Sequence, residues 1–122
     1  MNGTLRILVA DDDVLCRKLL TSQLTKAGYQ VLIASDGQEA LNWIFSPHHR
    51  PDLVLLDLLM PRFSGLEVLE RLKTVSWKLP VILMSGAERP IAREGVSQSS
   101  PDAFIKKPFL MNDLLLKIDN LL

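Results

Sequence analysis

The chain has 122 residues, the size of one ordinary domain, and its 48% hydrophobic and 23% charged residues are typical of a globular protein. Its 14 basic residues balance 14 acidic ones, which argues against direct nucleic-acid binding through counterion release. The single cysteine, Cys16, cannot form an internal disulfide, which favours a reducing compartment. Without an apolar stretch as long as a signal peptide or a membrane span, we expect a cytoplasmic protein with no membrane partner.

The first half of the chain alternates short apolar runs with amphipathic segments. Residues 5–10 are predicted to form a strand, which stops at the three aspartates of residues 11–13. From residue 14 to residue 27 apolar residues recur at helical spacing, and Gly28 then ends the helix as a C-terminal cap would. The apolar face of this helix is expected to consist of Leu15, Cys16, Leu19, Leu20 and Leu24.

The same alternation continues to the end of the chain. Further strands are expected at 31–34, 53–56, 80–84 and 103–106, and further helices at 40–45, 66–75 and 111–122. The run 53–56 is apolar throughout, as suits a central parallel strand that is buried on both faces. The segment Glu88–Asp102 has the length of a helix but the wrong composition, so we expect a short, frayed or displaced helix there.

Strands that alternate with helices predict an α/β fold built from right-handed crossovers. We expect a doubly wound five-stranded parallel sheet in the order 2-1-3-4-5 with helices on both faces, which is a flavodoxin-like fold. In such sheets ligands bind beyond the carboxyl ends of the strands, where the strand order reverses.

Polar side chains stand at the carboxyl ends of several of these strands. Asp11 and Asp12 follow the first strand, Asp57 the third, Ser85 the fourth and Lys107 the fifth. Crowded carboxylates repel one another by about 4 kcal/mol at ~4 Å in a medium of intermediate dielectric, so at least one of their pKa values is expected to rise. A divalent cation would relieve the repulsion, and carboxylate oxygens suit Mg²⁺.

Together, these residues resemble the receiver domains of bacterial two-component response regulators over nearly the whole chain. Ile7–Asp13 resembles the first strand and acidic pair of that family, and Asp57–Pro61 resembles its phosphoacceptor segment. Met84–Gly86 is similar to its Thr/Ser switch segment, and Lys107–Phe109 is similar to its Lys-Pro-Phe sequence. Phe63–Gly65 departs from the Met-Asp/Asn-Gly that the family often has there. Each motif alone is weak, whereas the ordered set at these spacings is a strong signal.

The resemblance implies a chemical role for the acidic residues. Asp57 would be the phosphoacceptor, the nucleophile that takes a phosphoryl group from a phosphohistidine. Asp12 and Asp57 would bind Mg²⁺ together with the backbone carbonyl of Leu59. Asp11 would share the metal or hold a metal-bound water. The metal would neutralise charge on the transferring group, whose transition state depends on positioning and electrostatics.

Three more residues complete the implied switch. Lys107 would pair with a phosphoryl oxygen, and the Lys107-Pro108 bond is expected to be cis, which would aim the ammonium into the pocket. Ser85 would donate a hydrogen bond to another phosphoryl oxygen. Phe104 stands where the family has an aromatic residue that changes rotamer as Ser85 engages phosphate, although a static core aromatic explains it equally well. Phosphorylation would then change the shape of the face around the fifth strand for a downstream partner.

Other residues near these motifs have simpler interpretations. Asp13 is expected to cap the helix that follows it rather than to bind metal. His48 and His49 lie in a loop on the opposite side of the third strand, so we expect them on the surface. Leu59 and Ala87 flank the phosphoryl position, and apolar side chains there cannot orient an attacking water. The protein is thus expected to catalyse its own phosphorylation and only slow dephosphorylation, without being an enzyme in the usual sense.

Three other classes of protein agree less well with the sequence. An aspartate-nucleophile phosphatase needs Thr or Val where Leu15 stands, and it needs room for a cap domain. A flavin-binding module needs a phosphate loop rich in free backbone donors, where three aspartates would instead repel phosphate. A receiver that has lost its chemistry and acts only as a protein-binding module remains the alternative, although all the key residues are present.

The expected organisation is a single receiver domain over residues 1–122 with no output domain in this chain. Its expected partners are a sensor histidine kinase or phosphotransfer protein, and either a downstream protein or a fused output domain. The sequence identifies neither the kinase nor the target.

Overall fold

Five parallel strands form the central sheet of the computed structural model, in the order β2-β1-β3-β4-β5. The structure describes residues 3–72, 74, 77–86 and 101–122. The strands are β1 (Arg6–Ala10), β2 (Gln30–Ala34), β3 (Leu53–Asp57), β4 (Val81–Ser85) and β5 (Ala103–Lys106). The expected doubly wound sheet and its strand order are confirmed.

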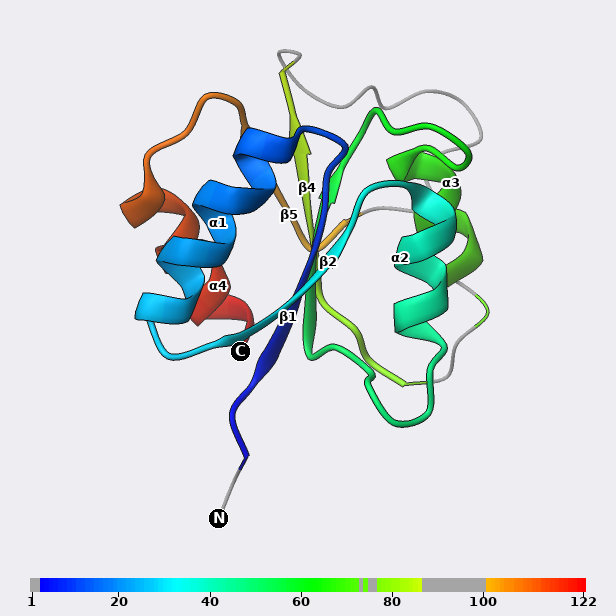
Figure 1. Ribbon diagram of the computed structural model, residues 1–122, viewed down its shortest axis with the longest axis horizontal. Coiled ribbons are helices and arrows are strands. Elements are labelled where there is room, and N and C mark those ends of the chain that lie inside the picture. Colours follow the sequence, from blue (N-terminus) through cyan, green and yellow to red (C-terminus); the bar gives the residue numbers. More distant parts are fainter. Residues whose placement is uncertain (1–2, 73, 75–76, 87–100) are drawn as a thin grey trace.

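Helices cover both faces of this sheet (Figure 1). Among the described residues they are α1 (Val14–Lys26), α2 (Gly37–Ile44), α3 (Gly65–Leu72) and α4 (Met111–Leu121). Helices α1 and α4 lie on one face, and α2 and α3 lie on the other. Side chains of β1 alternate between the two layers, so that Ile7 and Val9 pack beneath α1 and α4 while Leu8 packs beneath α2 and α3.

The third strand lies at the centre of the sheet, and every one of its residues is buried. The strand is one residue longer than the expected 53–56, because Asp57 still pairs with Met84 of β4 as its last residue. A carboxylate therefore ends a fully buried strand, and the sheet holds its backbone rigidly. No described helix has the length and apolar character needed to span a bilayer.

Helix α1 packs through a narrower stripe than its sequence predicts. Leu20 and Leu24 are fully buried, and Cys16 packs against the same core from one turn earlier. Leu15 and Leu19 were expected on this face, but they are 75% and 53% exposed. The reason is helical geometry: residues four apart share a face, so Leu15 and Leu19 form a second row beside the buried one.

The two ends of α1 agree with the sequence prediction. Asp13 is the N-cap, and its side chain accepts a hydrogen bond from the Leu15 amide at 3.0 Å. Gly28 follows the helix with a φ of 101°, the left-handed conformation that ends many helices. Ala87 and residues 88–100 of the expected fourth helix lie outside the described residues, so the expectation for them stays a prediction.

Candidate functional site

Three aspartates meet at the carboxyl end of the sheet. Asp57 ends β3, while Asp11 and Asp12 follow β1, which pairs directly with β3. One carboxylate oxygen from each residue lies within 4.8 Å of the others. Asp11 is fully buried, Asp57 is 8% exposed and Asp12 faces the solvent. The acids that the sequence places at the ends of the first and third strands therefore meet, and Asp12 is the one that faces solvent.

The ammonium group of Lys107 reaches this cluster from the segment that follows β5. The Lys107 Nζ lies 2.7 Å from Asp11 Oδ2 and 3.5 Å from Asp57 Oδ2. Lys107 directly follows β5, and its amide donates to the Ser85 carbonyl at 2.7 Å, which anchors the start of its loop. The Lys107-Pro108 peptide bond is cis, as expected. Lys107 thus belongs to the site, and its closer partner is Asp11 rather than Asp57.

The two buried carboxylates are pushed in opposite directions by their surroundings. Burial, followed by the nearby charge of Asp11, raises the pKa of Asp57 from 3.8 to about 6. Burial acts to raise the pKa of Asp11, but the hydrogen bonds from Lys107, the Asp13 amide and Cys16, together with the charge of Lys107, outweigh it, and this pKa is lowered. Burial acts to lower the pKa of Lys107, but the hydrogen bond to Asp11 and the negative charges of Asp11 and Asp57 together outweigh it, and this pKa is raised. Asp57 is therefore the carboxylate that is repelled by Asp11 and whose repulsion Lys107 does not offset.

Backbone and side-chain hydrogen bonds hold Asp11 in place. Its Oδ1 accepts from the Asp13 amide at 2.9 Å, and its carbonyl accepts from Arg17 Nη1 at 2.8 Å. Sequence reasoning missed Arg17. The available signal was a long cation in the first turns of a helix, because helical side chains point back toward the N-terminus and so toward the preceding loop. Arg17 therefore tethers helix α1 to the loop that carries the acids.

The loop after Asp57 is held close to the site by two backbone hydrogen bonds. The Leu58 amide donates to the Met84 carbonyl at 2.9 Å, and the Gly65 amide donates to the Leu58 carbonyl at 2.8 Å. A Cβ at position 65 would overlap the Asp57 carbonyl oxygen, so only glycine allows α3 to start here. Leu59 lies in this loop, two residues after Asp57, and is 74% exposed.

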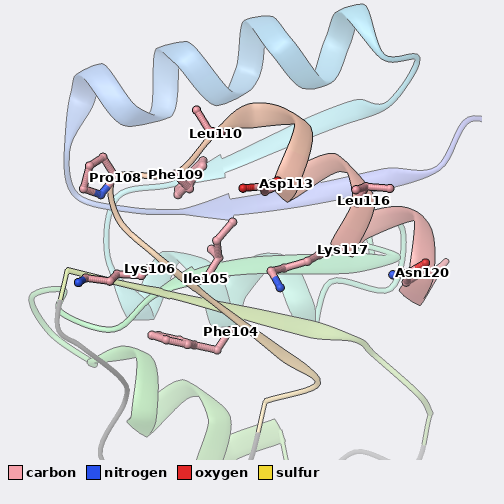
Figure 2. A pocket seen from close by; sticks show the side chains of 10 residues that line it. All are labelled: Phe104, Ile105, Lys106, Pro108, Phe109, Leu110, Asp113, Leu116, Lys117 and Asn120. Atoms are coloured by element: carbon pink, nitrogen blue, oxygen red, sulfur yellow. The ribbon is translucent and has the colours of Figure 1, made fainter.

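The expected switch residues lie on the neighbouring strands. Ser85 is 3% exposed and ends β4, the strand beside Asp57. Phe104 of β5 packs against the core beneath α2 and α3, and Figure 2 shows its ring on the opposite side of the strand from Ile105. Phe104 also lines a groove of about 520 Å³ between β5 and α4. Its half-buried position is compatible with either a mobile or a static aromatic.

The histidines lie away from this site. His48 and His49 are exposed in the loop that precedes β3, and the His48 carbonyl accepts from Arg6 Nη1 at 3.4 Å. Arg6 begins β1, so the loop lies at the amino-terminal edge of the sheet. The expected surface position of the two histidines is confirmed.

The donor set of the cluster fits a divalent cation. Three carboxylates face one ammonium, so negative charge is in excess, and the raised pKa of Asp57 is the electrostatic consequence. All the side-chain donors are hard oxygen atoms, and Asp12 is open to solvent on the side where further ligands would enter. Magnesium and calcium favour such ligands, and magnesium commonly retains some of its water molecules and binds phosphate oxygens.

Known proteins resemble this chain over nearly its whole length. The sequence profile described as "Response regulator receiver domain" matches residues 7–119. The response regulator MprA of Mycolicibacterium vanbaalenii is 39% identical over 117 residues, which cover 96% of this chain and 50% of that protein. MprA of Mycobacterium avium is 38% identical over 118 residues, which cover 97% of this chain and 51% of that protein. The chain thus spans about half the length of these relatives.

Solved structures agree with the sequence relatives. The response regulator TrrA of Thermotoga maritima, determined in complex with Mg²⁺-BeF, superposes with a TM-score of 0.85 at 34% identity, covering 98% of this chain and 100% of that one. The chemotaxis response regulator CheY4 of Vibrio cholerae superposes with a TM-score of 0.87 at 25% identity, with the same coverage. With the acid cluster at the carboxyl end of the sheet and the profile matching almost every residue, the chain belongs to the family of response regulator receiver domains.

Proposed function

We propose that this receiver domain is a phosphorylation-controlled switch in which Asp57 accepts a phosphoryl group. The observation that carries the proposal is the meeting of Asp57, Asp11 and Asp12 within 4.8 Å, with Lys107 reaching both buried acids. Asp57 is the least compensated of the buried carboxylates, so it gains most from an incoming cationic or metal-bound group. A protein-binding module without chemistry would not need this costly concentration of charge.

The acids and one backbone carbonyl would form the metal site. Asp12, Asp57 and the Leu59 carbonyl would bind Mg²⁺, and Asp11 would share it or hold one of its water molecules. Charge neutralisation on the phosphoryl oxygens is what bound Mg²⁺ supplies to the reaction. Asp57 then attacks the phosphorus of a phosphohistidine, a new P–O bond forms as the P–N bond breaks, and the imidazole leaves.

Lys107 and Ser85 would recognise the product. Lys107 would shift part of its pairing from Asp11 to a phosphoryl oxygen, and the Ser85 hydroxyl would donate to another oxygen. Ser85 lies beside β5, so its movement would make room for Phe104 to change rotamer. The groove between β5 and α4 would change shape, and a partner that prefers the new shape would shift the population.

The proposal extends to the partners of the domain. A sensor histidine kinase or a phosphotransfer protein would supply the phosphoryl group, and a downstream protein or a fused output domain would respond to it. We place these events in the cytoplasm, where the single thiol Cys16 stays reduced. Residues 1–122 would act as one receiver domain in this scheme.

Acetyl phosphate provides a direct test of the proposed chemistry. The protein is incubated with this small donor in Mg²⁺ or in excess chelator, and intact mass is measured immediately. We expect the mass of one phosphoryl group to be added only when Mg²⁺ is present, and peptide mapping should place it on Asp57. An adduct that forms equally well in chelator, or that maps to another residue, would contradict the proposal.

The exposed Leu59 side chain leads to a prediction about the lifetime of the acyl phosphate. An apolar group beside the site cannot position a water molecule for attack, so spontaneous loss of the phosphoryl group should be slow. Leu59→Asn is expected to speed this loss several-fold, as measured by the decay of the phosphorylated mass after the donor is removed. Leu110→Asn, at an exposed leucine before α4, serves as the control and should leave the decay unchanged. Equal decay in the Leu59→Asn and wild-type proteins would refute the idea.

A further inference from the structure

An ion pair joins two loops beside the acid cluster. Arg62, in the loop between β3 and α3, donates from Nη2 to Asp36 Oδ2 at 2.7 Å. Asp36 precedes α2 and caps it, because its Oδ1 accepts from the Glu39 amide at 2.8 Å. The Asp36 side chain is 11% exposed, while that of Arg62 is 68% exposed. Asp36 therefore attaches an exposed arginine to the start of a helix.

The backbone of the same loop is shaped against the start of α2. Arg62 has a φ of 63°, a left-handed conformation that is uncommon for a residue with a side chain. The Gly37 amide donates to the Pro61 carbonyl at 3.4 Å, and the Phe63 amide donates to the same carbonyl at 2.9 Å. A Cβ at Gly37 would overlap the Phe63 carbonyl oxygen. The left-handed turn at Arg62 is thus in direct contact with the start of α2.

Leu59 lies between the two anchors of this loop. On one side, the Leu58 amide is bonded to β4 through the Met84 carbonyl at 2.9 Å. On the other side, two attachments join the loop to the start of α2: the Pro61 carbonyl accepts from the Gly37 amide at 3.4 Å, and Arg62 pairs with Asp36 at the shorter distance of 2.7 Å. The ion pair of Arg62 is therefore the shorter of the two contacts that fix the far end of the segment carrying Leu59, although Arg62 is itself exposed.

We propose that Arg62 is a positioning residue of the metal site, whose ion pair with Asp36 holds the Leu59 carbonyl in its metal-binding conformation. This inference rests on the proposed function, because it requires that Mg²⁺ binds the three acids and this carbonyl. In this role Arg62 does not contact the metal. Its ion pair with Asp36 orders the loop in advance, which lowers the free-energy cost of ordering it when the metal binds.

The sign of the effect separates positioning from simple electrostatics. Removing a positive charge near a site for a divalent cation should strengthen metal binding if long-range repulsion alone is at work. Loss of the loop attachment should instead weaken binding, because the loop must then be ordered at the expense of binding energy. Arg62→Gln therefore has opposite predicted outcomes under the two explanations.

The experiment measures the Mg²⁺ dissociation constant of each variant by titration calorimetry. Arg62→Gln is expected to raise the constant by about fivefold, the upper range for one partly exposed ion pair. Asp36→Asn and the double variant should show the same increase rather than a summed one, because both single changes break the same contact. Arg62→Lys should recover part of the affinity. Arg50→Gln, which removes an equal charge from a side chain stacked on Trp77, is the control and should bind like the wild type.

A second measurement does not require the metal. In the metal-free Arg62→Gln protein, the Phe63 amide should exchange its hydrogen faster than in the wild type, while amides of β3 should be unchanged. Equal or tighter Mg²⁺ binding by Arg62→Gln would overturn the positioning role and leave the proposed function standing. If the wild-type protein bound no Mg²⁺ at all, the proposed function would fail and this inference would fail with it.

Discussion

The Asp57→Asn protein is expected to take up no phosphoryl group from acetyl phosphate and, without metal, to unfold at a higher temperature than the wild type. The first effect follows because an amide is not a nucleophile for this reaction. The second follows because burial and the charge of Asp11 raise the pKa of Asp57 to about 6, so the folded protein disfavours the ionised carboxylate. A pKa shift of this size corresponds to a gain of roughly 2–3 kcal/mol in the free energy of unfolding. The melting temperature should then be higher by on the order of 5–10 °C.

The stability difference between Asp57→Asn and the wild type should depend on pH, and the direction of that dependence tests the electrostatic explanation. The folded-state pKa of Asp57 lies above its ordinary 3.8, so wild-type stability from this group is greatest in acid and is lost as the pH rises toward about 6. The gain from Asp57→Asn should thus be absent at low pH and complete above about pH 6. Saturating Mg²⁺ should shrink it. Asp113→Asn, an exposed acid of α4, should show no such gain, and a pH-independent difference for Asp57→Asn would refute the electrostatic explanation.

Replacing Lys107 with methionine should have the opposite effect on the metal-free protein. Methionine keeps much of the aliphatic side chain but leaves Asp11, which is fully buried, without its ion pair at 2.7 Å. Breaking such a pair from one side is costly, and we expect a loss of about 2–3 kcal/mol at neutral pH. Chemical denaturation of the two proteins measures the difference.

The pH dependence again follows from the pKa direction. Lys107 lowers the pKa of Asp11, so the pair stabilises the fold above the ordinary pKa of an aspartate and loses its effect as the pH falls. The cost of Lys107→Met should therefore disappear in acid. Adding Asp11→Asn should recover most of the loss at neutral pH, because no buried charge is then unpaired. Lys18→Met, at an exposed lysine of α1, should be nearly neutral, and a comparable loss there would contradict the assignment.

The sequence was sufficient for the features that depend on local pattern. The fully apolar run of β3, the Asp13 cap and the left-handed Gly28 are each set by neighbours within a few residues, and the structure confirms all three. The sequence also predicted that Asp11, Asp12 and Asp57 come together, because parallel strands bring their carboxyl ends to one edge of the sheet. The expected rise of one carboxylate pKa is found at Asp57.

Other features depend on contacts that no local pattern contains. Leu15 and Leu19 have the spacing of a buried row, yet the rotation of α1 on the sheet buries the adjacent row instead. The partner of Lys107 could not be chosen in advance, because Asp11 is 96 residues away and Asp57 is equally close in the topology. The pair of Arg62 with Asp36 joins two loops across 26 residues. Local spacing specifies which elements form, whereas the rotation of a helix and the choice among several charges depend on how whole layers pack together.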